Sequence, residues 1–303
     1  MDMQTTFRSQ LYAAGLLFPT GVDGLVGRNG VFEAIFTGLE SAITRAGLAD
    51  KPEVMRFPPA MSQQTFERSG YMKNFPHFAG TVHCFCGDDR DHHQLLGKMA
   101  KGEDWMDKQA PADIVLTPAA CYQVYPIVAQ RGDLKPGGHL VDVQSYCFRH
   151  EPSLEPTRMQ LFRMREYVRI GTEEEVLAFR ADWMERGQAF VDSLHLPYEV
   201  EVANDPFFGR AGKLMADSQR MQNLKFELLI PVNDGAGPTA CLSFNYHQTY
   251  FGDTWGMNNA DGTTAQTACC AFGMERLVLA MLRHHGFDPA QWPSAVKQTL
   301  GFD

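Results

Sequence analysis

The chain has 303 residues, 44% of them apolar and 21% charged, which is typical of a globular protein with a full core. Its net charge of −9 offers no support for nucleic-acid binding, because proteins that neutralise many phosphates usually carry a basic patch. No apolar run approaches about 18 residues and no secretory signal is present, so neither a membrane span nor export is expected. The seven cysteines lack the spacing of a disulfide framework and indicate a reducing compartment, so we expect a cytoplasmic protein.

The first predicted element is a long helix over residues 29–46, where apolar residues recur at helical spacing. It ends at Gly47, a residue type that commonly caps a helix C-terminus. A short strand over residues 53–57 follows and runs into Pro58 and Pro59. This region therefore predicts a helix, a strand and a proline turn in that order.

Two further helices are predicted later in the chain. Thr172 and Glu175 have the spacing of a capping box, so a helix should begin there and run to about Leu194. The second helix covers residues 274–284, is amphipathic and stops at Gly286.

Two short segments carry residue types that ATP chemistry requires. Residues 148–151 read Phe-Arg-His-Glu, and residues 273–276 read Gly-Met-Glu-Arg. Adenylation brings a carboxylate against the α-phosphate of ATP, so fixed cations and magnesium must offset the charge that develops. Arginine suits this task because its planar guanidinium binds phosphate bidentately and stays charged at any working pH. Taken singly, either segment also fits a surface ion pair or an arginine that snorkels from an apolar helix.

Taken in order, the helix–strand–proline region and these two segments resemble motifs 1, 2 and 3 of class II aminoacyl-tRNA synthetases. The resemblance implies an α+β fold with a mainly antiparallel sheet flanked by helices. It also implies a single catalytic domain over residues 1–303, with a helical insertion near residues 87–109. A homodimer should form through residues 29–60, because motif 1 makes the dimer interface in this family.

The resemblance assigns roles to four polar residues. Arg149 would hold the α-phosphate of ATP, and Glu151 would contact the adenine or the bound amino acid. Arg276 would cover the other face of the adenine and reach the γ-phosphate. Glu227 is the candidate ligand for Mg²⁺, with no second ligand assigned.

An aromatic side chain should stack on the adenine. Tyr167, four residues after Arg163, fits the position where the family carries phenylalanine. A rival register that runs from Arg158 through Phe162 to Glu166 also matches the pattern. We prefer Tyr167, because this register leaves Glu166 free for a second role.

Within class II the chain resembles seryl-tRNA synthetases along nearly its whole length, through residues 116–121, 225–229 and 251–255. Three residues depart from the common pattern: Cys121, Glu166 and Cys269. They resemble the zinc site of the atypical, methanogen-type seryl-tRNA synthetases.

Two thiolates and one carboxylate suit Zn²⁺ and would leave its fourth position open for the free amino group of a substrate. Cys270 is the alternative to Cys269, but neighbouring strand residues point to opposite faces, so only one of them can be a ligand. A competing metal site is the segment 83–86, which reads His-Cys-Phe-Cys, with His92 and His93 close behind. Its spacing does not match the usual zinc patterns, and it also fits an ordinary strand followed by a histidine-rich turn.

A seryl-type core that starts motif 1 at residue 29 leaves little room for a tRNA-binding region. Such a truncated core resembles the bacterial amino acid:[carrier protein] ligases. The resemblance implies activation of glycine or alanine with ATP and transfer to the phosphopantetheine thiol of a carrier protein, with tRNA not expected as the acceptor. The alternatives are a seryl-type synthetase paralogue acting on tRNA or another small nucleophile, and a catalytically silent binding subunit.

Carrier proteins are typically acidic, so the ligase should present a basic docking surface. The insertion at residues 87–109 is the candidate, because it carries Lys98, Lys101 and Lys108. Two nearby aspartates balance part of this charge, so a simple solvated helix is the alternative interpretation.

Overall fold

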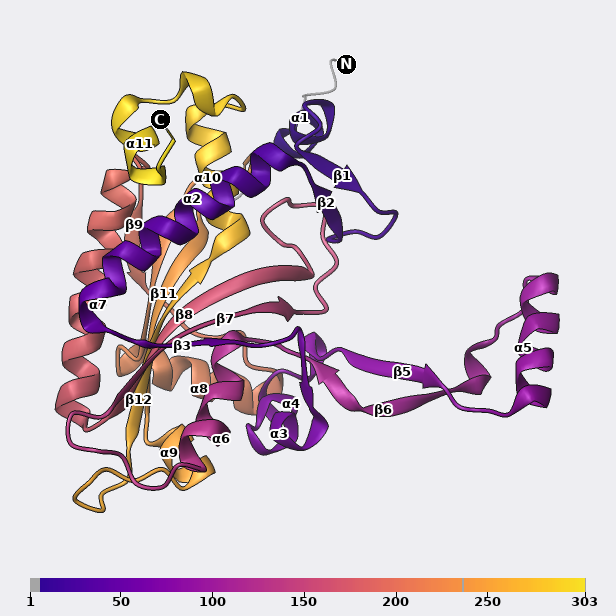
Figure 1. Ribbon diagram of the computed structural model, residues 1–303, viewed down its shortest axis with the longest axis horizontal. Helices are drawn as coiled ribbons and strands as arrows, with labels where there is room; N and C mark the ends of the chain where they lie inside the picture. The colour runs from indigo at the N-terminus through magenta and orange to yellow at the C-terminus, as the bar shows by residue number, and fades with distance from the viewer. Residues whose placement is uncertain (1–5, 236, 303) are drawn as a thin grey trace.

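The architecture, seen in a computed structural model that describes residues 6–235 and 237–302, is built on a seven-stranded sheet (Figure 1). Its first strand is the predicted one after the long helix, and it pairs parallel with its neighbour, whereas all other pairings in this sheet are antiparallel. The mainly antiparallel α+β fold predicted from the sequence is therefore confirmed. In spatial order the strands are β3 (Glu53–Arg56), β7 (His139–Phe148), β8 (Leu161–Gly171), β12 (Gln266–Gly273), β11 (Thr239–Gln248), β10 (Lys225–Ile230) and β9 (Glu199–Val202).

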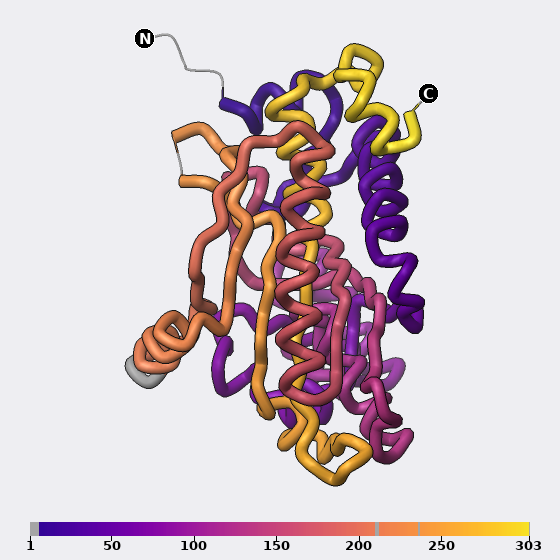
Figure 2. Tube along the Cα trace, turned by 90° about the vertical axis from the view of Figure 1, so that its left-hand side faces the viewer, coloured from indigo at the N-terminus to yellow at the C-terminus, as the bar shows by residue number. Residues whose placement is uncertain are grey.

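Long helices cover one face of this sheet and enclose the main hydrophobic core. The predicted helices are present, with Asn29 and the Thr172–Glu175 capping box at the start of the first two. Figure 2 shows the second of them lying along the strands. The helices of this layer are α2 (Gly30–Gly47), α7 (Glu173–Ser193), α10 (Met274–His285) and α11 (Ser294–Leu300).

The opposite face of the sheet carries smaller elements, and one arm extends from the body of the protein (Figure 1). The arm is a three-stranded sheet of β4 (Ala60–Ser62), β6 (Gln109–Leu116) and β5 (Thr81–Phe85), with α5 (Asp89–Lys101) at its tip. The expected insertion at residues 87–109 contains this helix. No helix in the described part of the chain is long and apolar enough to cross a membrane.

The remaining elements are shorter and lie around the two sheets. The helices are α1 (Phe7–Ala13), α3 (Gln63–Arg68), α4 (Tyr71–Asn74), α6 (Val124–Ala129), α8 (Gly209–Met221) and α9 (Tyr250–Trp255). The other elements are β1 (Leu17–Pro19), β2 (Val26–Arg28) and the 3-10 turns η1 (Leu48–Asp50), η2 (Pro76–Phe78), η3 (Met106–Lys108), η4 (Ala120–Gln123) and η5 (Pro289–Gln291).

Strand β8 separates the core from the cavity side, because successive side chains alternate between its faces. Phe162, Met164 and Glu166 face the cavities, and Arg165 and Tyr167 face the helices. This alternation decides which residues of motif 2 can meet a ligand.

Candidate functional site

Two adjoining cavities open on the sheet face that α2 and α7 leave uncovered. The volume of the first, described next, is about 180 Å³, and that of the second is about 150 Å³. Seven lining residues are common to both, so the cavities form one continuous site with two compartments: Arg149, Met164, Asp205, Pro206, Lys225, Ser243 and Ala271.

The first compartment, which we call the nucleotide cavity, holds four residues predicted to contact ATP or magnesium. Arg149, Glu151, Glu227 and Arg276 all line it. Their positions come from the end of β7, the loop after it, β10 and the first turn of α10. The structure therefore brings these four sequence-predicted residues together.

The two arginines are held by backbone carbonyl groups. Arg149 Nε donates to the carbonyl oxygen of Pro118 at 3.3 Å, and Arg276 Nε and Nη1 donate to those of Thr157 and Ala240 at 3.0 and 2.9 Å. Burial lowers the pKa of both guanidinium groups, but nearby tyrosines, thiols and carboxylates give Arg149 a net rise. Both side chains stay charged, since an arginine pKa lies far above neutrality.

The acidic residue of motif 2 is not free. Glu151 forms an ion pair with Arg158, which also pairs with Glu155 at 2.8 Å. Any contact between Glu151 and a ligand therefore competes with Arg158.

The predicted stacking role of Tyr167 is contradicted by its position. Tyr167 is 1% exposed, stacks on Trp183 of α7 at 4.2 Å, and donates its hydroxyl hydrogen to the carbonyl of Ile43 in α2. The cause is the alternation of β8: if Glu166 faces the cavity, the next residue faces the core. Phe162, from the rival register, lines the nucleotide cavity, and Arg149 lies over its ring at 5.6 Å.

The second compartment, which we call the amino-acid cavity, contains the three residues predicted to bind zinc. Cys121, Glu166 and Cys269 all line it. The Cys121 backbone N–H donates to Glu166 Oε1 at 2.9 Å, and Cys269 Sγ accepts from Asn245 Nδ2 at 3.3 Å. The structure thus brings together residues that lie on η4, β8 and β12.

Electrostatics keeps both thiols protonated in the metal-free protein. The Cys269 thiol, burial and the Glu166 charge raise the pKa of Cys121 well above its usual range. For Cys269, the hydrogen bond with Cys121 lowers the pKa, but burial and Glu166 outweigh it and leave a net rise.

No three His, Cys, Asp or Glu side chains in the described residues stand as a group that could hold a metal ion. The chemistry of the donor set still fits zinc, because two thiols and a carboxylate share one cavity. Cys270 is packed in the helix-side core, as expected for the neighbour of a cavity-facing residue. Cys84 and Cys86, of the competing cluster, are exposed on the arm.

Several cavity residues were not identified from the sequence. Asp205, Asn245 and His247 line the amino-acid cavity, and burial lowers the pKa of His247 to about 4, so its imidazole is neutral near pH 7. Asn245 and His247 lie on β11 with the same parity as Ser243, which also lines the cavity. Alternation along β11 could have grouped these three, but nothing in the sequence placed the Asp205 loop against them.

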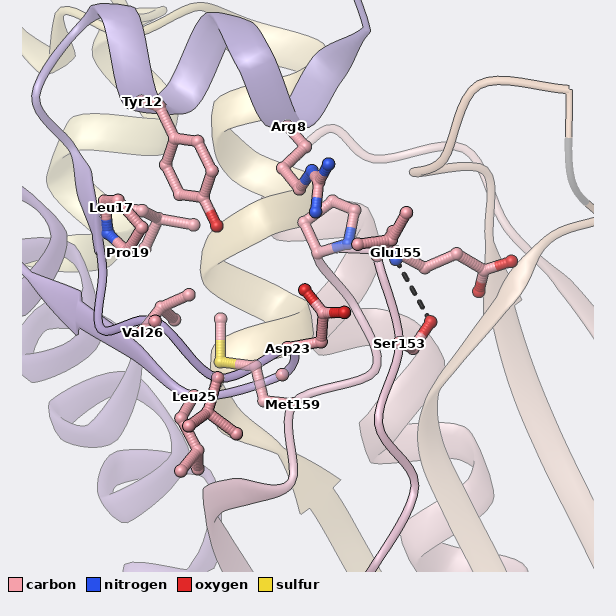
Figure 3. Close-up of a pocket in the computed structure, with 15 residues that line it drawn as sticks. Arg8, Tyr12, Leu17, Pro19, Asp23, Leu25, Val26, Ser153, Glu155 and Met159 are labelled. Atoms are coloured by element: carbon pink, nitrogen blue, oxygen red, sulfur yellow. Dashed lines mark hydrogen bonds between the residues drawn. The ribbon is translucent and has the colours of Figure 1, made fainter. Parts of the chain in front are cut away.

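A third cavity lies behind the motif 2 loop, between α1, the β1–β2 hairpin and residues 153–159 (Figure 3). Its wall is mainly apolar, with Arg8, Tyr12 and Asp23 around it. Met159 lines both this cavity and the nucleotide cavity.

Comparison with known proteins identifies relatives of high sequence identity. The chain is 48% identical to amino acid–[acyl-carrier-protein] ligase 1 of Bradyrhizobium diazoefficiens, over 94% of this chain and 87% of that one. It is 46% identical to ligase 2 of the same organism, over 95% and 86% of the two chains. The type-2 serine–tRNA ligase of Methanopyrus kandleri is 27% identical, over 89% of this chain and 54% of that one. No protein-family model matches the chain.

Solved structures show the same fold at low identity. The seryl-tRNA synthetase of M. kandleri, solved with a tRNASec from A. aeolicus, superposes with a TM-score of 0.82 at 20% identity. The seryl-tRNA synthetase of Pyrococcus horikoshii, solved with ATP, gives 0.70 at 13% identity. The superpositions include 97 and 98% of this chain but only 60 and 63% of the two synthetase chains. The likeness therefore covers their class II catalytic fold.

The sequence identity, unlike the structural likeness, extends over nearly the full length of both proteins compared. The chain belongs to the amino acid–[acyl-carrier-protein] ligase family.

Proposed function

We propose that this protein uses ATP to activate glycine or alanine and transfers it to the phosphopantetheine thiol of an acidic carrier protein. In the first step the amino-acid carboxylate attacks the α-phosphate, and pyrophosphate leaves. In the second step the thiol attacks the carbonyl of the adenylate, AMP leaves, and a thioester remains. The bacterial relatives are named as ligases for an amino acid and an acyl carrier protein.

One observation carries the proposal: Arg149 lies where the two compartments of the site adjoin. A substrate carboxylate bound there would lie against the α-phosphate of a nucleotide in the adjoining cavity. Arg276 faces the same space and would offset charge on the phosphates, and Phe162 offers a flat apolar surface for the adenine. Glu227 is the candidate Mg²⁺ ligand.

The amino-acid cavity supports a small substrate that binds through its amine. Cys121, Glu166 and Cys269 would hold Zn²⁺, which when bound supplies an open position that selects a deprotonated amino group. Tyr122, Met164 and Phe251 crowd the rest of the cavity. Extra methylene groups in so restricted a space are costly, which favours glycine and alanine.

The carrier contact at the arm rests on fewer free charges than the sequence implied. Lys98 pairs with Asp107 at 2.6 Å and Lys108 with Asp91 at 2.8 Å. Lys101 is exposed at the end of α5. The arm stays our candidate docking surface, and of its three predicted lysines Lys101 is the one with no ion pair among the described residues.

A seryl-type activity on tRNA is the second candidate, because the type-2 serine–tRNA ligases share the fold and part of the sequence. The two candidates differ in substrate and acceptor. The test supplies purified zinc-replete protein with ATP, each amino acid, and either a phosphopantetheinylated acidic carrier or tRNA.

We expect the carrier to gain the mass of one glycyl or alanyl group, and hydroxylamine should remove it because the bond is a thioester. The same carrier without its phosphopantetheine arm is the control and should stay unloaded. Serylated tRNA together with an unloaded carrier would refute the proposal in favour of the second candidate.

A further inference from the structure

Two oppositely charged side chains stand at the junction of the amino-acid and nucleotide cavities. Asp205 and Lys225 line both compartments, as does Arg149. Lys225 Nζ forms an ion pair with Asp205 and lies 3.2 Å from Glu227 Oε1. The Lys225 side chain is only 11% exposed, so water solvates its ammonium group poorly.

Asp205 is held in turn by a residue that lines neither cavity. Gln219, in α8, accepts a hydrogen bond from the Asp205 backbone N–H through Oε1 at 2.7 Å. Its Nε2 donates to Asp205 Oδ2 at 2.9 Å. One amide therefore fixes both the backbone and the carboxylate of Asp205.

Other contacts attach the loop around Asp205 to β10 and to α4. Ala203 N–H donates to the Lys225 carbonyl at 2.9 Å, and Phe208 N–H donates to that of Asn74 at 2.9 Å. Phe207 stacks on Phe75 with ring centroids 5.0 Å apart. These contacts fix the ends of the loop, whereas the direction of the Asp205 carboxylate depends on Gln219 and Lys225.

The Asp205 carboxylate keeps its charge near neutral pH. Burial raises the pKa of Asp205, but the Lys225 charge and the hydrogen bond from Gln219 outweigh it and leave a net fall.

We infer that Gln219 is a positioning residue for the activation step: it orients Asp205, and Asp205 holds the Lys225 ammonium where the carboxylate meets the α-phosphate. The inference rests on the proposed adenylation and adds a residue outside both cavities to it. An ammonium is a point charge on a flexible stem, so it needs a fixed partner to stay in one place. A cation already fixed next to the phosphate oxygens where negative charge develops stabilises the transition state more than a cation that must first be ordered.

The functional test compares Gln219→Leu with wild type in amino-acid-dependent exchange of pyrophosphate into ATP. We expect kcat to fall about tenfold, since one charge-assisted hydrogen bond to the ion pair is lost. The KM for ATP should change by less than about twofold, because the nucleotide contacts of Arg149 and Arg276 remain. Gln219→Glu should lose more activity than Gln219→Leu, because it sets a second carboxylate against Asp205.

The matched control is Gln222→Leu, one turn further along the same segment. Gln222 is exposed, and among the described residues its side chain bonds only to Ser218 and Gln248. It should behave as wild type in every measurement.

A second readout needs no turnover: the rate at which an amine-specific acylating reagent labels Lys225, followed by peptide mass spectrometry. Gln219→Leu should label several-fold faster than wild type and Gln222→Leu, with all three equally folded by thermal melting. Equal labelling and equal kcat in all three would overturn the inference. If wild type shows no exchange with any amino acid, the proposed function fails, and the labelling rates still judge the role of Gln219.

Discussion

At the scale of single residues, the parity of a strand decides which side chain of motif 2 can meet the nucleotide. Phe162 and Glu166 face the cavities, while Tyr167 packs between α2 and α7. The rival register was open from the sequence and is the one that the structure supports. The sequence contained the information to choose it, because residues 166 and 167 cannot face the same side of one strand.

Replacing Phe162 tests this assignment. We expect Phe162→Ala to raise the KM for ATP by on the order of tenfold, because stacking of one base on an aromatic ring is worth about 1–3 kcal/mol. Tyr167→Phe keeps the core ring and removes only hydroxyl contacts on the helix side, the bond to the Ile43 carbonyl and the one accepted from Arg165 Nη2, so its KM for ATP should equal that of wild type. Steady-state exchange kinetics at varied ATP measure both, and a raised KM in the tyrosine variant alone would contradict the account.

Cys121 of η4 and Cys270 of β12 offer a pair of variants that tests the zinc proposal. Cys121→Ser should lose bound zinc and reduce amino-acid activation by at least about a hundredfold. Replacing residues that merely support metal ligands already costs about 10–100-fold in metal affinity or activity, and a ligand itself should cost more. Cys270→Ser makes the same chemical change next to Cys269 but on the core side, and should keep its metal. Metal content by mass spectrometry decides. Wild-type zinc and activity in Cys121→Ser would rule out the site.

At the scale of elements, a buried ion pair of the sheet contacts helix α2, which belongs to the motif 1 region. Arg165 of β8 pairs with Asp142 of β7 at 2.6 Å, and its Nη1 donates to the Glu40 carbonyl of α2 at 2.7 Å. The side chains of Arg165 and Asp142 are 1 and 4% exposed. This contact fixes β8, and hence Phe162 and Glu166, relative to α2.

Removing one partner of this pair leaves a buried charge without compensation. Asp142→Ala should lower the free energy of unfolding by about 3–5 kcal/mol, measured by urea denaturation. Glu155→Ala breaks only the exposed pair with Arg158 and should cost less than about 1 kcal/mol. Similar small losses in both variants would show that the buried pair does not hold the sheet and helix together.

The sequence predicted most elements but not their long-range partners. Helices α2, α7 and α10 were identifiable from local signals, namely apolar periodicity and the caps at Thr172 and Gly286. Gly47, expected to cap α2, is instead its last helical residue, and Leu48 is the C-cap. The contact between Gln219 and Asp205 depends on how α8 folds back on the loop before it. No spacing rule encodes that arrangement, so this part of the site required the structure.

At the scale of the whole molecule, the predicted homodimer remains a proposal that the surface supports. Within the part of the chain that the structure describes, β3 is an edge strand of the main sheet, and such edges can pair with another chain. Val54 on this strand is 62% exposed, and Leu48 at the end of α2 is 66% exposed. Both lie within residues 29–60.

Charges at these positions should prevent association. We expect Leu48→Glu combined with Val54→Glu to give the mass of one chain in light scattering, where wild type gives two. Val202→Glu, at the other edge of the same sheet, is the control and should leave the mass unchanged. A monomeric wild type, or a double variant that stays dimeric, would contradict the proposed interface.

The central claim is that the two joined cavities activate a small amino acid. Amino-acid-dependent exchange of pyrophosphate into ATP, across all twenty amino acids on zinc-replete protein, tests it most directly. The account predicts strong exchange with glycine or alanine and little with serine. Exchange driven mainly by serine, or by no amino acid at all, would contradict it.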